Sequence, residues 1–120
     1  MQRTYLNAKI HRATVTKADL DYEGSVTIDQ SLMESANIQA YEAVHIWDVT
    51  NGQRIQTYAI PGLPGSGEIQ INGGAAHLVQ AGHVVVIASF VTLTADEAKS
   101  HKPRKVFVDG ANRITETVIG

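Results

Sequence analysis

One run of apolar residues in the second half of the chain limits the possible folds most. Residues 84–91 (VVVIASFV) are almost continuously apolar and rich in β-branched side chains. A run of this length and composition is typical of a strand that is buried on both faces. Such a strand needs a neighbour on either side, so we expect it at the centre of a sheet.

Shorter strand patterns fill most of the remaining sequence. The residues around Trp47 alternate between apolar and polar, and Asn51-Gly52, the strongest short signal for a hairpin, follows at once. Many short strands with turn signals between them predict a mainly β fold, most simply a small closed barrel. The strands that we expect are residues 9–16, 44–49, 54–60, 84–91, 106–109 and 114–118.

Two short helices are expected among these strands. Asp29 is a residue type that begins helices, and residues 29–34 could form one or two turns. Thr94 and Glu97 have the spacing of a capping box, which predicts a second helix from residue 94 to 99. The chain has 120 residues, so we expect a single domain over residues 1–120.

The composition excludes several kinds of chemistry. The chain has no cysteine, which excludes disulfides, thiolate nucleophiles and thiolate metal ligands. Its net charge of -2 gives no indication of a nucleic-acid partner or an anionic membrane. The five histidines lack the spacings of metal ligands, so we expect no metal. No apolar stretch approaches the roughly 20 residues of a membrane helix, and no signal peptide is evident, so we expect a cytoplasmic protein.

The dipeptide Gly24-Ser25 could support self-cleavage of the chain. A serine hydroxyl that is pushed onto the preceding carbonyl can accept the acyl group from nitrogen, and elimination and hydrolysis then leave a pyruvoyl group. Glycine at position 24 removes a steric barrier and permits unusual backbone angles. In isolation the pair is better explained by an ordinary turn, because Gly-Ser pairs are common.

Several segments in order and at matching spacing resemble the bacterial aspartate 1-decarboxylase family. The resemblance covers residues 3–108 and implies a double-psi β-barrel that forms β-alanine from L-aspartate for pantothenate synthesis. The segments that carry it are KIHRATVT (9–16), ADLDYEGS (18–25), TNG (50–52) with Arg54, TYAI (57–60) and INGGAAH (71–77).

The resemblance implies a cofactor made from the chain itself. Ser25 would become the pyruvoyl group, and Gly24 would end a short chain of residues 1–24, with residues 25–120 forming the longer chain. The pyruvoyl ketone would form a Schiff base with the substrate amine and take the place of pyridoxal phosphate. The family is homotetrameric, with sites between subunits. The sequence leaves open whether a maturation partner assists cleavage.

Three side chains match family residues that act on the substrate. Tyr58 would donate the proton that replaces the lost carboxylate, because a tyrosine is protonated at neutral pH. Arg54 would bind a substrate carboxylate, for which a guanidinium is well suited, and Lys9 would add a second positive charge. Without the resemblance, a half-buried strand tyrosine and two solvated surface cations would be the better explanation of these residues.

Other residues are assigned to the site by the same resemblance. Arg54 and Tyr58 share one face of a regular strand, and Thr57 points to the other, so either a bulge or a neighbouring subunit is needed to bring Thr57 to the cleavage site. The small side chains of Gly73, Gly74 and Ala75 would let backbone amides approach a carboxylate, although an ordinary turn explains them too. Supporting residues are His11, Tyr22, Trp47 and Asn72.

Two alternatives remain open from the sequence. One is a pyruvoyl decarboxylase for another amino acid, which the positive charges of Arg54 and Lys9 disfavour. The other is a barrel that binds a ligand or partner and is never cleaved. Asp21 departs from the histidine that many family members carry, which puts the rate of self-cleavage in question.

Overall fold

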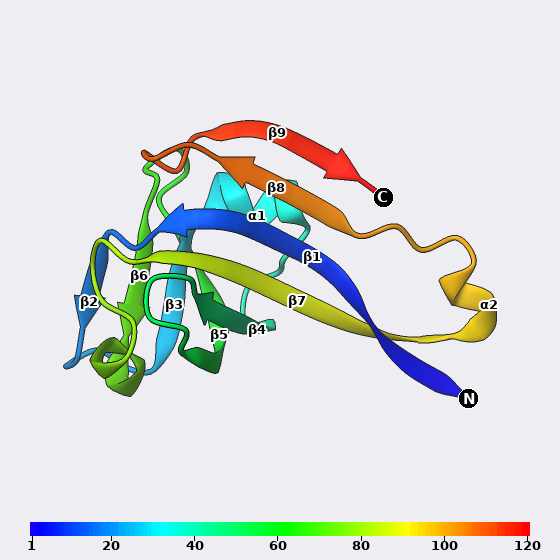
Figure 1. Cartoon of the computed structure of the whole chain (residues 1–120), viewed down its shortest axis with the longest axis horizontal. Helices are drawn as coiled ribbons and strands as arrows, with labels where there is room; N and C mark the ends of the chain where they lie inside the picture. The colour runs from blue at the N-terminus through cyan, green and yellow to red at the C-terminus, as the bar shows by residue number, and fades with distance from the viewer.

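The computed structural model describes residues 1–120 and consists mainly of strands (Figure 1). This confirms the expected mainly β fold with few, short helices. The elements in chain order are β1 (Gln2–Thr14), β2 (Lys17–Asp19), β3 (Ser25–Asp29), α1 (Gln30–Ala36), β4 (Ala43–Asp48), β5 (Arg54–Gly62), β6 (Ile69–Asn72), the 3-10 helix η1 (Gly73–His77), β7 (Val84–Thr94), α2 (Ala95–Ala98), β8 (Arg104–Val108) and β9 (Ile114–Ile119).

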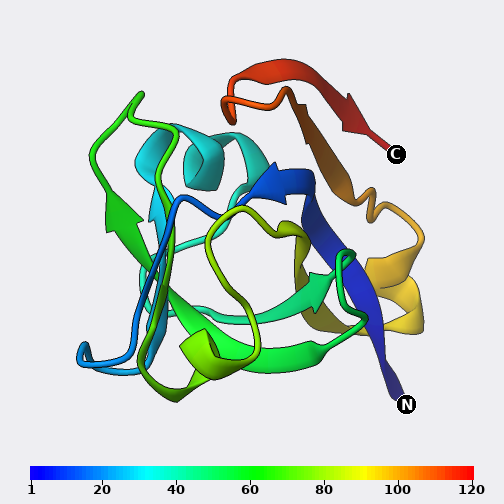
Figure 2. The ribbon, with the colours of Figure 1, turned by 60° about the vertical axis from the view of Figure 1, so that its left-hand side comes forward.

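The sheet closes into a small barrel because β1 and β2, which stand far apart in the strand order, follow one another directly in the sequence. The strand order is β2-β6-β3-β5-β4-β7-β1-β8-β9, and β2 follows β1 after only two residues. At this junction the amide of Val15 donates to the carbonyl of His83 (2.9 Å), and the amide of Thr16 donates to the carbonyl of Ile69 (2.8 Å). The strands from β1 round to β6 and β2 therefore surround a common interior, and β8 and β9 extend the sheet beyond β1 (Figure 2).

The interior of the barrel is filled by apolar side chains that lie in register across the strands. Ile10 of β1 pairs with Ile87 of β7, which pairs with Ile46 of β4, and Ile46 pairs with Ile55 of β5. The first three are fully buried, and Ile55 packs against the same core. Burial of each such side chain contributes about 1.5–3 kcal/mol to the free energy of unfolding. Side chains alternate along each strand, so the residues on either side of this row face outward.

The central strand was predicted correctly, but its burial ends earlier than expected. β7 lies between β1 and β4, and residues 85–89 are buried. From Phe90 onward its side chains are at least partly exposed, because β7 continues with the first residues of β1 as a two-stranded ribbon that projects from the barrel (Figure 1). This pairing also explains why β1 begins at Gln2 rather than at residue 9. β1 ends at Thr14, after a bulge in which Arg12 has a φ of 60°.

The predicted helix starts and the predicted hairpin are confirmed. Asp29 caps α1, and Thr94 and Glu97 form the complete capping box of α2. β4 and β5 pair on either side of Asn51-Gly52, where Gly52 has a φ of 79° that favours glycine. None of the helices has the length and apolar composition required to cross a membrane.

Asp29 also fastens the loop between β5 and β6 to the start of α1. Its buried carboxylate accepts hydrogen bonds from the amides of Ser31 (2.8 Å), Gly65 (3.0 Å) and Gly67 (2.9 Å). Burial raises the pKa of this carboxyl, but the hydrogen bonds from Gly67, Ser31 and Gly65 together lower the pKa below its usual value. The charged form is therefore the one that stabilises the fold.

Replacing Asp29 with asparagine is expected to lower the free energy of unfolding at pH 7 by about 1–3 kcal/mol, because at least one buried amide loses its acceptor. The lowered pKa means that this stabilisation is present above the unfolded value of about 4 and is lost as the pH falls through the folded value. The difference between Asp29→Asn and wild type should therefore shrink in acid. Urea denaturation at pH 7 and pH 3 measures it. Asp96→Asn, at an exposed side chain, is the control and should change stability little at either pH.

Candidate active site

Ser25 is the first residue of β3 and lies in a buried hydrogen-bond network. Its Oγ accepts a hydrogen bond from Nδ2 of Asn72 (2.9 Å) and donates one to the carbonyl of Glu23 (3.3 Å). Both Ser25 and Asn72 are buried, and they are paired residues of the antiparallel strands β3 and β6. The hydroxyl next to the predicted cleavage bond is thus held in a defined position by a side chain that the sequence had assigned a supporting role.

Two residues that sequence reasoning missed hold Asn72 in turn. Nε2 of Gln70 donates to Oδ1 of Asn72 (2.8 Å), and Nδ2 of Asn72 also donates to Oγ1 of Thr27 (3.1 Å). Because side chains alternate along a strand, Gln70 shares a face with Asn72, and Thr27 shares a face with Ser25. The alternation of polar and apolar residues in β3 and β6 was the sequence signal that could have identified Thr27 and Gln70. We call Ser25, Thr27, Gln70, Asn72 and Gly73 the serine cluster.

Gly73 brings the start of η1 against the residue that precedes Ser25. A Cβ atom at position 73 would lie 2.9 Å from Cα and 3.0 Å from N of Gly24, and 3.1 Å from the carbonyl oxygen of Tyr22. Gly73 also has a φ of 76°, a conformation that favours glycine. The backbone around the Gly24–Ser25 bond is therefore packed against a position where no side chain fits. Ser25 is buried, is held by the side-chain amide of Asn72 and lies beside this close contact. This arrangement suits a cofactor that is formed from the serine itself.

Replacing Gly73 with alanine should strongly slow any cleavage between Gly24 and Ser25, because the new methyl group must displace the Gly24 backbone. The measurement is the fraction of cut chains over time by intact mass. Gly74→Ala is the matched control, since nothing lies within 4 Å of a Cβ there. Equal cleavage rates in the two variants would show that the contact with Gly24 has no role.

The alternation of β5 separates Thr57 from Arg54 and Tyr58, as the sequence predicted. Arg54 and Tyr58 are exposed, whereas Thr57 is half-buried, and the pairing of β4 with β5 has no bulge. β3 and β5 are parallel from Val26 opposite Ala59, so Ser25 lies level with Tyr58 on the outward face. By the same register Thr57 lies level with Gly24. A bulge in β5 is therefore not the means by which Thr57 approaches the cleavage bond.

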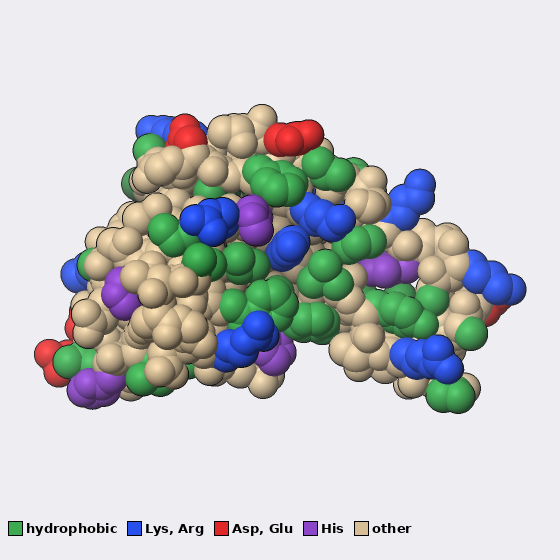
Figure 3. Space-filling view, viewed as in Figure 1, with side chains coloured by type: hydrophobic (Ala, Val, Ile, Leu, Met, Phe, Trp, Pro, Cys, Tyr) green, Lys and Arg blue, Asp and Glu red, His purple; other side chains and the backbone are tan.

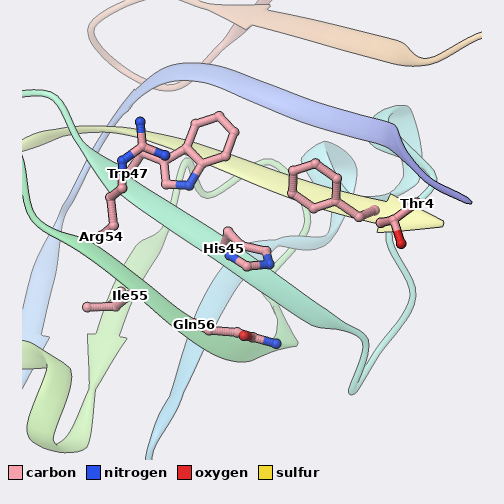
Figure 4. A pocket seen from close by; sticks show the side chains of 7 residues that line it. Thr4, His45, Trp47, Arg54, Ile55 and Gln56 are labelled. Atoms are coloured by element: carbon pink, nitrogen blue, oxygen red, sulfur yellow. The ribbon is translucent and has the colours of Figure 1, made fainter. Parts of the chain in front are cut away.

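The cationic residues gather elsewhere on the outer surface of the barrel. The guanidinium carbon of Arg54 lies 4.9 Å from the ring centroid of Trp47, and Figure 4 shows the two side chains together above β4 and β5. They border an open cleft of about 510 Å³. The ring of His45 packs edge-on against Phe90 at 5.1 Å in the same cleft. The residues that line it are Thr4, His45, Trp47, Arg54, Ile55, Gln56 and Phe90.

Lys9 and His11 belong to the same outward surface. Lys9 is in register with Ala88, His45 and Gln56 across β1, β7, β4 and β5, one row away from the core isoleucines. His11 packs edge-on against Phe107 at 5.4 Å. We use the name cationic face for the outward surface formed by Lys9, His11, His45, Trp47 and Arg54.

The cationic face is rich in positive charge and poor in carboxylates. Figure 3 shows Lys, Arg and His side chains among hydrophobic ones where β1 crosses the molecule, with Asp and Glu only towards its edges. Desolvation by burial, followed by the charges of Lys9 and Arg12, lowers the pKa of His11, so its imidazole is neutral near pH 7. Nδ1 of His11 is buried without a hydrogen-bond partner. Neither Lys9 nor Arg54 forms an ion pair within the chain.

A single chain does not bring the cationic face to Ser25. Arg54 and Tyr58 are four residues apart on an extended strand, which separates their backbones by about 13 Å. Lys9 lies on β1, and β7 and β4 stand between that strand and β5 in the strand order. The guanidinium of Arg54 leans onto Trp47 of β4, on the side of β5 away from β3. The serine cluster and the cationic face are therefore two separate parts of the candidate site.

The remaining predicted residues lie close to the serine cluster. Tyr22 is exposed in the turn before Ser25, and its carbonyl borders Gly73. Gly74 is exposed and Ala75 packs against the core, both within η1. No group of three or more His, Asp or Glu side chains is arranged to hold a metal ion.

Comparisons with known proteins point to one family. The family model described as aspartate decarboxylase matches residues 1–115. The aspartate 1-decarboxylase of Syntrophotalea carbinolica is 59% identical over 112 residues, which are 93% of this chain and 86% of that protein. The proteins of the same name from Stenotrophomonas maltophilia (strain K279a) and Xanthomonas campestris pv. campestris are each 53% identical over 117 residues, 98% of this chain and 93% of theirs.

Proposed function

This chain belongs to the aspartate decarboxylase family, and we propose that it converts L-aspartate into β-alanine and carbon dioxide with a pyruvoyl group made from its own Ser25. The observation that carries the proposal is the buried Ser25 hydroxyl, held by Asn72 and preceded by a glycine that packs against Gly73. The mature protein then consists of residues 1–24 and 25–120, which share one barrel.

The cleavage reaction uses only atoms of the chain and one water molecule. Oγ of Ser25 adds to the carbonyl carbon of Gly24, and the peptide nitrogen leaves, which gives an ester isomeric with the peptide. Loss of the α-proton of Ser25 and departure of the Gly24 carboxylate leave dehydroalanine. This enamine tautomerises to an imine, which water hydrolyses to release ammonia and leave the ketone. The hydrogen bond from Asn72 orients the hydroxyl for the first of these steps.

Residues of the chain then bind the substrate and move one proton. The pyruvoyl ketone supplies a carbonyl that takes up the amine of aspartate and accepts electrons as the α-carboxylate leaves. Tyr58 is level with Ser25 on the outward face of the neighbouring strand, which supports its role as the donor of a proton to the carbon left behind. The close contact of Gly73 with the Gly24 backbone supports a role for the backbone amides of Gly73, Gly74 and Ala75 in binding the substrate carboxylates.

The site is completed by a second copy of the chain, in a homotetramer. This is supported by the orientation of Arg54, whose guanidinium leans onto Trp47 of β4, away from β3 and from Ser25 of its own copy. Neither Arg54 nor Lys9 has a carboxylate partner in its own chain, which leaves both free to serve a neighbour. An interface between two different patches of the chain joins copies into a closed ring.

Intact mass and product analysis test the proposed function. The expected result is two masses for residues 1–24 and 25–120, the second blocked by pyruvoyl, and release of β-alanine from L-aspartate. Aspartate, glutamate, histidine and ornithine are assayed side by side. A single uncut chain under every condition would support the binding barrel instead, and faster turnover of another amino acid would overturn the substrate. The predicted cytoplasmic location and maturation partner stay predictions.

A further inference from the structure

An exposed tyrosine next to Tyr58 has no role in the site described so far. Tyr41 lies in the turn before β4, and its ring centroid is 6.4 Å from that of Tyr58, with 33° between the ring planes. This separation is within the range of interacting aromatic pairs. Tyr41 is 76% exposed, so burial in the core does not explain an aromatic residue here.

The backbone of Tyr41 is held in an unfavourable conformation. Its φ is 70°, a region that bulky residues rarely adopt. Two hydrogen bonds impose it: the amide of Tyr41 donates to the carbonyl of Ala59 (2.7 Å), and the amide of Ala59 donates to the carbonyl of Glu42 (3.0 Å). The turn is thus tied to the residue that follows Tyr58. Glycine would meet the same backbone requirement without strain, so the backbone does not call for a tyrosine.

The position of Tyr41 matters because of what flanks Tyr58. On the β3 side, Tyr58 lies level with Ser25, and on the β4 side its paired residue is Ala43. Alanine is too small to restrict the Tyr58 ring, which would leave that ring free to turn away from Ser25. The ring of Tyr41, in the turn that leads into β4, lies beside the ring of Tyr58.

We infer that Tyr41 is a positioning residue: its ring keeps the ring of Tyr58 directed towards Ser25. The inference rests on the proposed function, in which Tyr58 donates the proton after decarboxylation. A misdirected donor weakens the proton-transfer step but not substrate binding, and small displacements of a reacting group can have large effects on rate. Loss of the Tyr41 ring should therefore lower kcat about 10- to 100-fold and leave KM nearly unchanged.

Tyr41→Gly and Tyr41→Phe, each purified as the fully cleaved full-length protein, test the inference. Tyr41→Gly removes the ring and also relieves the backbone strain, so its Tm should equal or exceed that of wild type while kcat falls. Tyr41→Phe keeps the ring and should retain kcat. Asn37→Gly is the matched control, because Asn37 has a similar φ of 55° at the end of α1 and should leave kcat unchanged.

Each remaining outcome decides against the inference. Wild-type kcat in Tyr41→Gly would show that the ring has no positioning role, and a fall in Tm together with kcat would show a structural role. Loss of activity in Tyr41→Phe would place the effect on the hydroxyl rather than on the ring. If wild-type protein is cut but forms no β-alanine from L-aspartate, the proposed function itself fails and the inference falls with it.

Discussion

Replacing Ser25 with alanine leaves one uncut chain that forms no β-alanine from L-aspartate. The substitution removes the hydroxyl that attacks the Gly24 carbonyl, and with it the source of the ketone, so both cleavage and decarboxylation should be abolished. The fold should survive, because Nδ2 of Asn72 keeps its hydrogen bond to Thr27 when Ser25 Oγ is gone. Intact mass, Tm and product release are measured on the same sample.

Tyr58→Phe is the companion variant that separates the two reactions. It keeps the serine cluster, so the chain should be cut normally, while the loss of a general acid should lower kcat about 10²- to 10⁴-fold. Cleavage in Ser25→Ala would exclude the proposed chemistry altogether. Wild-type decarboxylation in Tyr58→Phe would assign the proton donor to another group.

Arg54→Ala should lose most activity towards L-aspartate, because the substrate carboxylate that we assign to this guanidinium would lose its charged partner. If the cationic face of one copy serves Ser25 of another, this loss can be repaired by a different inactive chain. Co-expression of Arg54→Ala with Ser25→Ala places an intact Ser25 opposite an intact Arg54 at about one quarter of randomly mixed interfaces. Activity should therefore reappear in the mixture.

The same mixture has a clear opposite outcome. If Arg54 acts on Ser25 of its own chain, every site in the mixture lacks one of the two residues and the mixture stays inactive. Ser25→Ala co-expressed with Tyr58→Phe is the control. Both of those residues belong to one copy in our proposal, so this pair should not recover activity.

Features set by neighbouring residues in the sequence were predictable. Asp29 and Thr94 cap helices through their own side chains, and Asn51-Gly52 forms its hairpin from local backbone preferences. The apolar run of β7 is central because its composition suits no exposed position. In each case the interaction that determines the structure lies within a few residues, so the sequence pattern contains it.

Features that depend on distant contacts were not predictable from pattern alone. Nothing local indicates that Ser25 pairs with Asn72, or that β3 lies parallel to β5. The resemblance assigned Arg54 and Ser25 to one site, but only the strand order and the contact with Trp47 show that Arg54 leans away from β3. The positive φ of Tyr41 likewise follows from its hydrogen bond to Ala59, eighteen residues further along the sequence.

The way the barrel closes determines what kind of molecule the cut protein would be. β1 lies between β7 and β8, and β2 pairs with β6 at the end of the strand order, so residues 1–24 carry one interior strand and one terminal strand of the sheet. Cutting after Gly24 leaves these hydrogen bonds in place, yet an unfolded mature molecule would be two separate solutes. Refolding of each barrel would then require two chains to meet, which adds a dependence on protein concentration that folding of a precursor barrel lacks. The peptide bond therefore makes folding of the barrel unimolecular, and it becomes dispensable once the barrel has closed.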